Sequence, residues 1–179
     1  MAKAPPVISV AVVEHTAFVK IPGRANFTSS VDFKTLVTEL RAQGVDHYVL
    51  DLGECVTMDS TFLGVLAGIA LRHVDGKRQD DTEKLHLDLL NPNARITDLL
   101  DNLGVMNLFT ISHQKTPCTA IFEPLSNSRP EPTREEMSQT CLEAHQLLMK
   151  INPDNIPKFK DVTQFLAEDL RKLKEQKQQ

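Results

Sequence analysis

The sequence predicts an α/β fold, a mixed β-sheet covered by helices, with a helical hairpin added as a C-terminal extension. Two observations predict the sheet and its helices. β-rich runs alternate with helically spaced apolar residues over the first two thirds of the chain, and 41% of the 179 residues are hydrophobic while 25% are charged. A third observation predicts the extension, because two further helical stripes follow a proline-rich stretch.

The chain opens with a predicted β-hairpin and a helix. Residues 7–13 and 17–21 are β-rich and are separated by three polar residues. Ser29, with Asp32 three positions later, resembles a capping box, and the apolar residues that follow recur at helical spacing until Gly44. This segment predicts a helix with one buried face.

Strands and helices alternate in the next part of the chain. Residues 48–52 predict a buried strand, which an acidic loop joins to an apolar helix that begins at 59–61. Residues 85–90 alternate at period two and predict a strand, and Asn93 is placed to cap another amphipathic helix. The last β-like residues lie in two segments, 109–112 and 118–122.

The helix that begins near residue 60 is apolar on nearly all sides and should be largely covered. Gly64 and Gly68 lie four residues apart in it, which we interpret as a close contact between the helix and a strand. A polar stretch of mixed charge at 75–81 follows and is predicted to be a solvated loop.

Composition changes at residues 124–132, where prolines, serines and an asparagine gather, and this stretch predicts a linker. It divides the chain into a predicted α/β domain at 1–123 and a helical extension at 133–179. Apolar residues of the extension recur at helical spacing on both sides of 152–157, where the helix must be interrupted. The resulting hairpin could pack on the α/β domain, or it could serve dimerisation or partner docking, and the sequence leaves both open.

Ser60 stands out because it lies where the apolar helix begins. Asp59, Ser60 and Thr61 can all accept hydrogen bonds from the free N–H groups of a helix N-terminus. Ser60 is therefore interpreted either as a simple cap or as the carrier of a phosphate group, which the helix dipole would favour. The phosphate interpretation requires the hydroxyl group to be solvent-accessible.

The segment 58–66 resembles the defining motif of STAS domains, the modules of anti-sigma factor antagonists and of the tails of sulfate transporters. In that family a strand ending in Asp-Leu-Ser is followed, a few residues later, by [Met/Ile/Val]-Asp-Ser-[Ser/Thr]-Gly-Leu-Gly-Val-Leu. This chain has Asp-Leu-Gly at 51–53 and Met-Asp-Ser-Thr-Phe-Leu-Gly-Val-Leu at 58–66, so Phe62 replaces the family glycine. The resemblance covers residues 7–123 and implies a STAS-like fold, with a hairpin first and βα units after it.

By this resemblance Ser60 is the expected phosphoacceptor, with Thr61 as the alternative. The implied function is a phosphorylation-gated protein-interaction switch, in which a phosphate adds about −1.5 to −2 charges beside Asp59 and changes partner affinity without changing the fold. The implied partners are an anti-sigma factor that is also a serine kinase of the histidine-kinase-like type, and a phosphatase. To Asp59, Ser60 and Thr61 as docking residues we add four others: Phe62, Gly23, Arg24 and Asn26.

Composition and motifs narrow the function classes. Acidic residues outnumber basic ones 24 to 20, for a net charge of −4, and no apolar run is long enough to span a membrane, so we expect neither nucleic acid nor a membrane as a partner. Three widely spaced cysteines indicate neither a disulfide framework nor a zinc site and suit a cytoplasmic protein. The six histidines are scattered and are expected at the surface or at strand edges. We predict no enzyme, metal or cofactor, because no nucleophile, base and orienter come together.

Two alternatives belong to other functional classes. The α/β domain could be a constitutive scaffold or dimerisation module, assembled as a homodimer or in a larger complex through residues 133–179. Phe62 favours this alternative, because it stands where the family motif has glycine. The chain could also be a detached transporter-associated STAS subunit.

Overall fold

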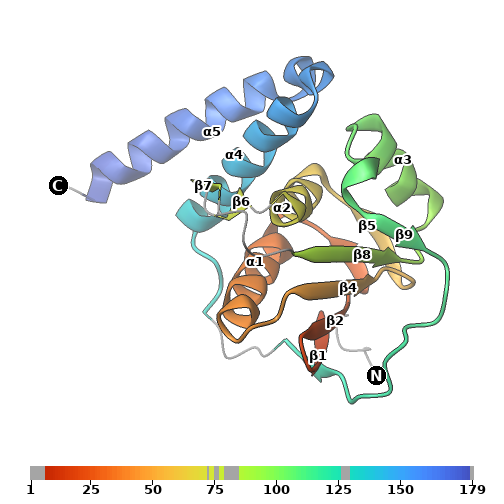
Figure 1. Ribbon diagram of the computed structural model, residues 1–179. Coiled ribbons are helices and arrows are strands. Elements are labelled where there is room, and N and C mark those ends of the chain that lie inside the picture. The colour runs from red at the N-terminus through yellow and green to blue at the C-terminus, as the bar shows by residue number, and fades with distance from the viewer. Residues whose placement is uncertain (1–6, 72, 75–76, 79–84, 126–129, 178–179) are drawn as a thin grey trace, which may run out of the picture.

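A central β-sheet organises the computed structural model, which describes residues 7–71, 73–74, 77–78, 85–125 and 130–177 (Figure 1). Among these residues the sheet contains six strands, in the spatial order β10 (Glu123–Pro124), β1 (Ser9–Val13), β2 (Thr16–Lys20), β4 (His47–Asp51), β8 (His86–Leu90) and β9 (Thr110–Ser112). The β1 strand is antiparallel to both of its neighbours, whereas β2, β4, β8 and β9 run parallel. The predicted α/β class with a mixed sheet is therefore confirmed.

Two short strand pairs lie outside this sheet. They are the parallel pair β3 (Gly23–Ala25) with β5 (Cys55–Met58), and the antiparallel pair β6 (His73–Val74) with β7 (Lys77–Arg78). The expectation of an acidic loop after β4 was thus incomplete, because the loop ends in the β5 strand. The predicted solvated loop at 75–81 lies for the most part outside the described residues.

Five helices follow the strands in the described part of the chain: α1 (Phe27–Ala42), α2 (Ser60–Ala70), α3 (Ala94–Asn102), α4 (Arg134–Ile151) and α5 (Ile156–Lys177). Two short 3₁₀ turns, η1 (Met106–Leu108) and η2 (Pro153–Asn155), complete the set. The order is a hairpin followed by βα units, as the STAS resemblance implied, and the predicted C-terminal helical hairpin is present.

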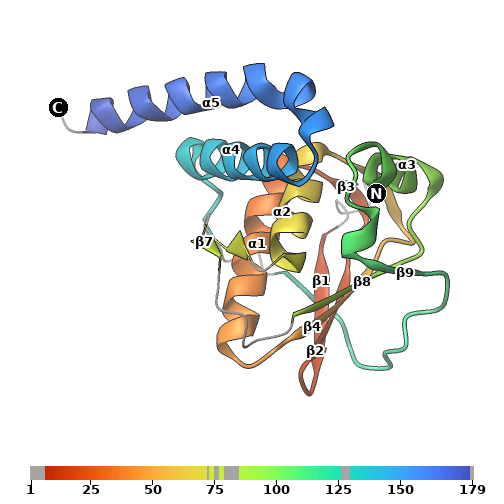
Figure 2. The ribbon, with the colours of Figure 1, turned by 45° about the horizontal axis from the view of Figure 1, so that its top comes forward.

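Figure 2 shows the elements as layers, with α1 and α2 on one face of the sheet, α4 across these two helices, and α5 outermost. The main core fills the space between the sheet and α1 and α2. Tyr48 and Leu50 of β4 point into it, together with Phe33 of α1 and Leu66 of α2, and all four side chains are fully buried. Side chains at alternate positions of a strand face opposite sides of the sheet, so Val49 belongs to the other face.

A second, smaller cluster covers that other face of the sheet. Phe18, Val49 and Leu90 form it, and Cys118 and Phe122 pack against them. The prediction of a strand at 118–122 was wrong, because this segment crosses the face of the sheet, and pairing with β1 begins only at the neighbouring edge strand β10. The apolar residues that suggested a strand instead cover this face of the sheet.

Helix α1 begins earlier than predicted. Its N-cap is Asn26, whose side-chain oxygen accepts hydrogen bonds from the backbone N–H groups of Thr28 and Ser29, while the Ser29 hydroxyl meets the Asn26 backbone N–H. A capping box is therefore present, but Ser29 is its third helical residue and not its cap. Gly44 follows the helix with φ of +88°, a conformation that glycine adopts readily.

The C-terminal hairpin packs on the α/β layers through α4. Thr133 caps α4 in a capping box with Glu136, and the helix ends where Asn152 and Pro153 start a 3₁₀ turn. Asn155 is buried in this turn and donates hydrogen bonds to the carbonyl groups of Leu103 and Leu148. The predicted linker at 124–132 includes residues 126–129, which lie outside the described part.

Candidate functional site

The beginning of α2 is held by Asp59, which is its N-cap. One carboxylate oxygen of Asp59 accepts a hydrogen bond from the Phe62 backbone N–H at 2.8 Å, and the other accepts one from the Phe27 backbone N–H at 2.7 Å. The Asp59 backbone N–H donates to the carbonyl group of Ala25. A single carboxylate thus ties the starts of α1 and α2 together, and the capping role falls to Asp59, which leaves the Ser60 hydroxyl free for another contact.

That contact is with the C-terminal hairpin. Ser60 is the first residue of α2 and is partly buried, and its Oγ lies 2.8 Å from Nε2 of His145 in α4. The two residues are 85 positions apart in the chain. Ser60 was expected to carry a solvent-accessible hydroxyl; the residue is partly exposed, and in this conformation α4 engages its hydroxyl.

His145 is enclosed between the Ser60 region and α5. The residue is 6% exposed, its ring stacks on Phe159 with 4.6 Å between the centroids, and its buried Nδ1 has no hydrogen-bond partner among the residues that the structure describes. Burial lowers the pKa of His145 below its ordinary value, and the nearby charge of Asp59 and the backbone of Cys141 oppose this only in part. The neutral ring is therefore favoured at the Ser60 contact.

Two further contacts join α2 to α4 beside the Ser60 pair. The Thr61 hydroxyl lies 3.4 Å from Sγ of Cys141, and burial raises the pKa of this cysteine. One turn along α2, a Cβ atom added to Gly64 would lie 2.6 Å from Cβ and 2.8 Å from the carbonyl oxygen of Ala144. The predicted contact of Gly64 with a strand was wrong, because the close neighbour of this glycine is a helix.

The other predicted docking residues lie in different environments. Phe62 is fully buried and packs on Phe33, with 5.3 Å between the ring centroids, so in this conformation its side chain cannot touch a partner. The helix period turns Phe62 away from Ser60 and into the core. Thr61 is also buried, which leaves Ser60 as the more accessible of the two hydroxyl groups.

Gly23, Arg24 and Asn26 are close to the beginning of α2 in the fold. Gly23 and Arg24 belong to β3, which pairs with β5 directly before Asp59, and Asn26 caps α1. Arg24 is exposed, while Gly23 and Asn26 are partly buried and already used by the backbone. The β3–β5 pairing therefore brings these three residues close to Asp59 and Ser60.

Sequence reasoning missed the α4 and α5 side of this site. His145 was expected at the surface or at a strand edge, but it is buried one turn after Cys141, beside the apolar stripe of α4. Its spacing from Cys141 was the signal in the sequence that could have indicated burial of His145. It could not reveal which surface the stripe covers, because the covered residue Thr61 lies 80 positions before Cys141 in the chain.

A serine nucleophile requires a histidine whose other ring nitrogen is oriented, and Nδ1 of His145 has no hydrogen-bond partner among the described residues. No group of three His, Cys, Asp or Glu residues in the described part of the chain is arranged to hold a metal ion. Likewise, none of the described helices combines the length and apolarity needed to cross a membrane.

Solved structures match part of this chain, including the following three. The anti-sigma factor antagonist SpoIIAA in its unphosphorylated form is 15% identical, with a TM-score of 0.48 over 59% of this chain and 87% of that one. A Thermotoga maritima protein described as a candidate anti-sigma factor antagonist is 18% identical, with a TM-score of 0.49 over 60% and 86%. The phosphorylated form of the Bacillus cell fate determinant SpoIIAA is 15% identical, with a TM-score of 0.44 over 59% and 90%.

No protein-family model matches the chain, and no curated protein matches it either. Because the three TM-scores are below 0.5, these likenesses say nothing about the function of this chain. The assignment of the fold depends on the strand order and the element order given above.

Proposed function

We propose that this chain is a protein-interaction switch of the anti-sigma factor antagonist kind, with Ser60 as its phosphoacceptor and the surface around the beginning of α2 as its docking site. The observation that carries the proposal is the position of Ser60 as the first residue of α2, directly after the capping Asp59. The resemblance of segment 58–66 to the STAS motif supports the same assignment.

The helix N-terminus supports a phosphate on Ser60. The Phe62 N–H is taken by the Asp59 side chain and the Leu63 N–H by the Asp59 carbonyl group, so the first N–H groups of α2 remain to solvate a dianion. The Asp59 carboxylate opposes the dianion by repulsion. A partner that docks over this region would meet the added charge directly.

The surroundings of Ser60 also support docking. Arg24 is exposed on β3, Phe27 is 46% exposed at the first residue of α1, and Val56 is 57% exposed on β5. An arginine with apolar neighbours is a composition typical of protein interfaces. The partner class proposed is an anti-sigma factor that is also a histidine-kinase-like serine kinase, with a phosphatase that restores the hydroxyl.

Mass spectrometry of the protein purified from its own host tests the phosphoacceptor. We expect phosphate on the 59–61 segment and its loss in Ser60→Ala. Co-purification tests the docking: Ser60→Glu should retain at least about tenfold less of the kinase partner than Ser60→Ala does. Native material without phosphate at Ser60, or equal partner recovery by the two variants, would contradict the proposal.

A constitutive scaffold is the second candidate, and the surface of α5 favours it. Val162 is 38% exposed and Phe165 is 64% exposed on the outer side of this helix. Removing the whole hairpin would uncover α2, so a point substitution is the better test. If α5 assembles the protein, Phe165→Ser should reduce the mass in solution to that of a monomer, whereas Gln176→Ser, an exposed change near the end of α5, should not.

A further inference from the structure

The surface of α2 that carries Ser60 is covered by a segment from the same chain. Along one line of α2, Ser60 meets His145, Thr61 meets Cys141, and Gly64 meets Ala144. Polar contacts at the helix start thus continue into a tight apolar contact one turn later. We infer that the α4–α5 hairpin is an intramolecular ligand of the α2 surface, and that a phosphoryl group on Ser60 releases it. This inference rests on the proposed function, because it assigns the regulation of the same site.

The Ser60 contact has no room for a phosphoryl group. The 2.8 Å distance from Oγ to Nε2 leaves space for one hydrogen atom, whereas a phosphoryl group places a phosphorus atom and three oxygen atoms there. The His145 ring cannot move back, because Phe159 of α5 stacks on it. The dianion would also face the Asp59 carboxylate in a partly buried position.

The chemistry of the step is a phosphoryl transfer from ATP. The kinase moves the γ-phosphoryl group to Ser60 Oγ: the new O–P bond forms, the bond from the γ-phosphorus to the bridging oxygen breaks, ADP leaves, and the hydroxyl proton passes to solvent. The transfer takes place while the hairpin is transiently open. The hairpin then cannot close again over the phosphorylated Ser60. The modification therefore shifts a pre-existing equilibrium between closed and open hairpins.

The released surface would be apolar and shaped for a helix. Gly64 and Val65 of α2 face α4, and Gly64 permits an approach so close that an added Cβ would overlap Ala144. The partner chemistry that fits this surface is an amphipathic helix with a small residue opposite Gly64. The hairpin and this helical partner, which is distinct from the kinase that docks on unmodified Ser60, would then compete for α2.

Hydrogen exchange of the full-length protein tests the release. In Ser60→Glu, the amides of α4 should exchange at least about tenfold faster than in the wild type, while those of β4 stay unchanged. The matched control is Thr28→Glu, which adds the same charge at an exposed position in the first turn of α1. It should leave α4 exchange within about twofold of the wild type.

A disulfide supplies the reverse experiment. Thr61→Cys places a second sulfur beside Cys141, so oxidation should join α2 to α4 and reduction should free them. In the double variant with Ser60→Glu, oxidation should return α4 exchange to the wild-type rate. Adding Cys141→Ser should abolish this effect of oxidation.

Two results would overturn the inference: α4 exchange in Ser60→Glu within twofold of the wild type, or an equal acceleration in α4 and β4, which indicates general destabilisation. If Ser60→Glu does not fold, His145→Glu places the carboxylate from the α4 side and must release α4 selectively. Failure here is distinct from failure of the proposed function. Phosphate on native Ser60 without hairpin release refutes only the inference, and release by the variants without native phosphate refutes only the proposed function.

Discussion

Helices α4 and α5 form one hairpin, yet they are buried to very different extents. Helix α4 lies between α2 and α5 and buries residues on both sides, including Ala144, His145 and Leu148. In the longer α5, the buried residues in the described part are Thr163 and Leu170. Helix α4 is thus part of the packed interior, whereas α5 lies on the outside of α4.

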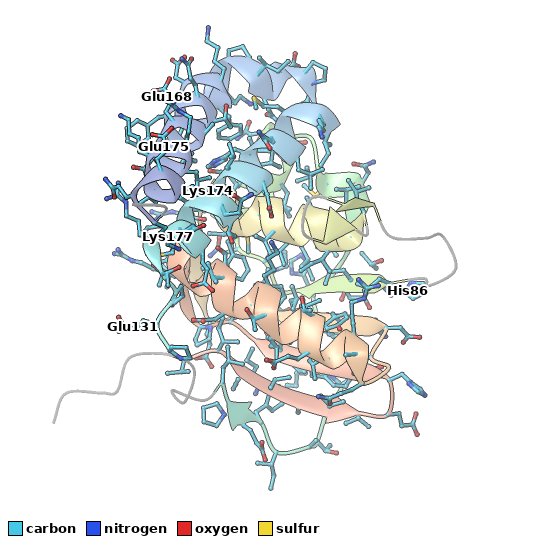
Figure 3. The ribbon with its side chains drawn as sticks, turned by 90° about the vertical axis from the view of Figure 1, so that its left-hand side faces the viewer. His86, Glu131, Glu168, Lys174, Glu175 and Lys177 are labelled. Atoms are coloured by element: carbon cyan, nitrogen blue, oxygen red, sulfur yellow. The ribbon has the colours of Figure 1, made fainter. Side chains whose placement is uncertain are left out.

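Charged contacts follow the same division. Helix α5 is joined to the beginning of α4 by the ion pairs of Arg134 with Asp169 and of Lys177 with Glu135, in which the basic side chains are largely exposed. Figure 3 shows Lys177 near the start of α4, and Glu168 and Glu175 on the outer side of α5. Exposed ion pairs contribute little, so we expect α5 to open more readily than α4. A helix that regulates a site must be able to leave it. In this hairpin α4 makes the specific contact with Ser60, and α5, which covers α4, is held by weak ion pairs.

The largest effect is expected where α4 is most deeply buried. Leu148→Ala should reduce the free energy of unfolding by about 2 to 5 kcal/mol, because it leaves a cavity where a fully buried leucine was. Leu173→Ala, at a partly exposed position of α5, is the matched control and should cost less than about 1 kcal/mol. Denaturant unfolding measures both values. Equal losses would remove the distinction between the two helices.

The second test concerns the close contact of α4 with α2. Gly64→Ala should destabilise the protein by about 1 to 3 kcal/mol, because the new methyl group overlaps Ala144 and forces the helices apart. Ala144→Gly added to this variant should restore only part of the loss, since the Ala144 carbonyl oxygen would still lie 2.8 Å from the new atom. Full recovery in thermal unfolding would show that the side chain alone sets the contact.

A smaller effect is expected at the Ser60 hydrogen bond. Ser60→Ala should cost about 1 kcal/mol, because Nε2 of the buried His145 loses its partner. Adding His145→Phe should recover most of this loss, since both polar groups are then replaced by apolar ones. A double-mutant cycle by denaturant unfolding measures the coupling, and additive losses would contradict the interaction.

The smallest expected effect is on pH dependence. The pKa of His145 is lowered in the folded protein, so between this value and the ordinary one the unfolded chain binds more protons and stability falls as the pH falls below about 6.5. Asp59 is the charged group that opposes the shift. Unfolding at pH 7.5 and 5.5 should show a smaller loss in His145→Gln than in the wild type. Identical losses of stability in the variant and the wild type would mean that the protonation of His145 does not change on unfolding.

Local patterns were sufficient to predict much of the fold. The alternation at 85–90 and the capping Asn93 correspond to β8 and the start of α3, because both signals act within a few residues. Errors arose where two patterns look alike locally. Residues 118–122 have strand-like composition but cover a sheet face, and Ser29 looks like a cap although Asn26 has that role.

The amino-acid sequence was enough to place a serine at the beginning of an apolar helix in an α/β fold, with two striped helices after it. Those features depend on periodicity and capping, which neighbouring residues decide. The packing of α4 on α2 and the contact of His145 with Ser60 became visible only in three dimensions. Such a pairing depends on the shapes of the two surfaces, because Gly64 has no side chain and Ala144 can therefore approach it closely. The pattern of apolar residues in a sequence does not show which apolar surfaces fit together.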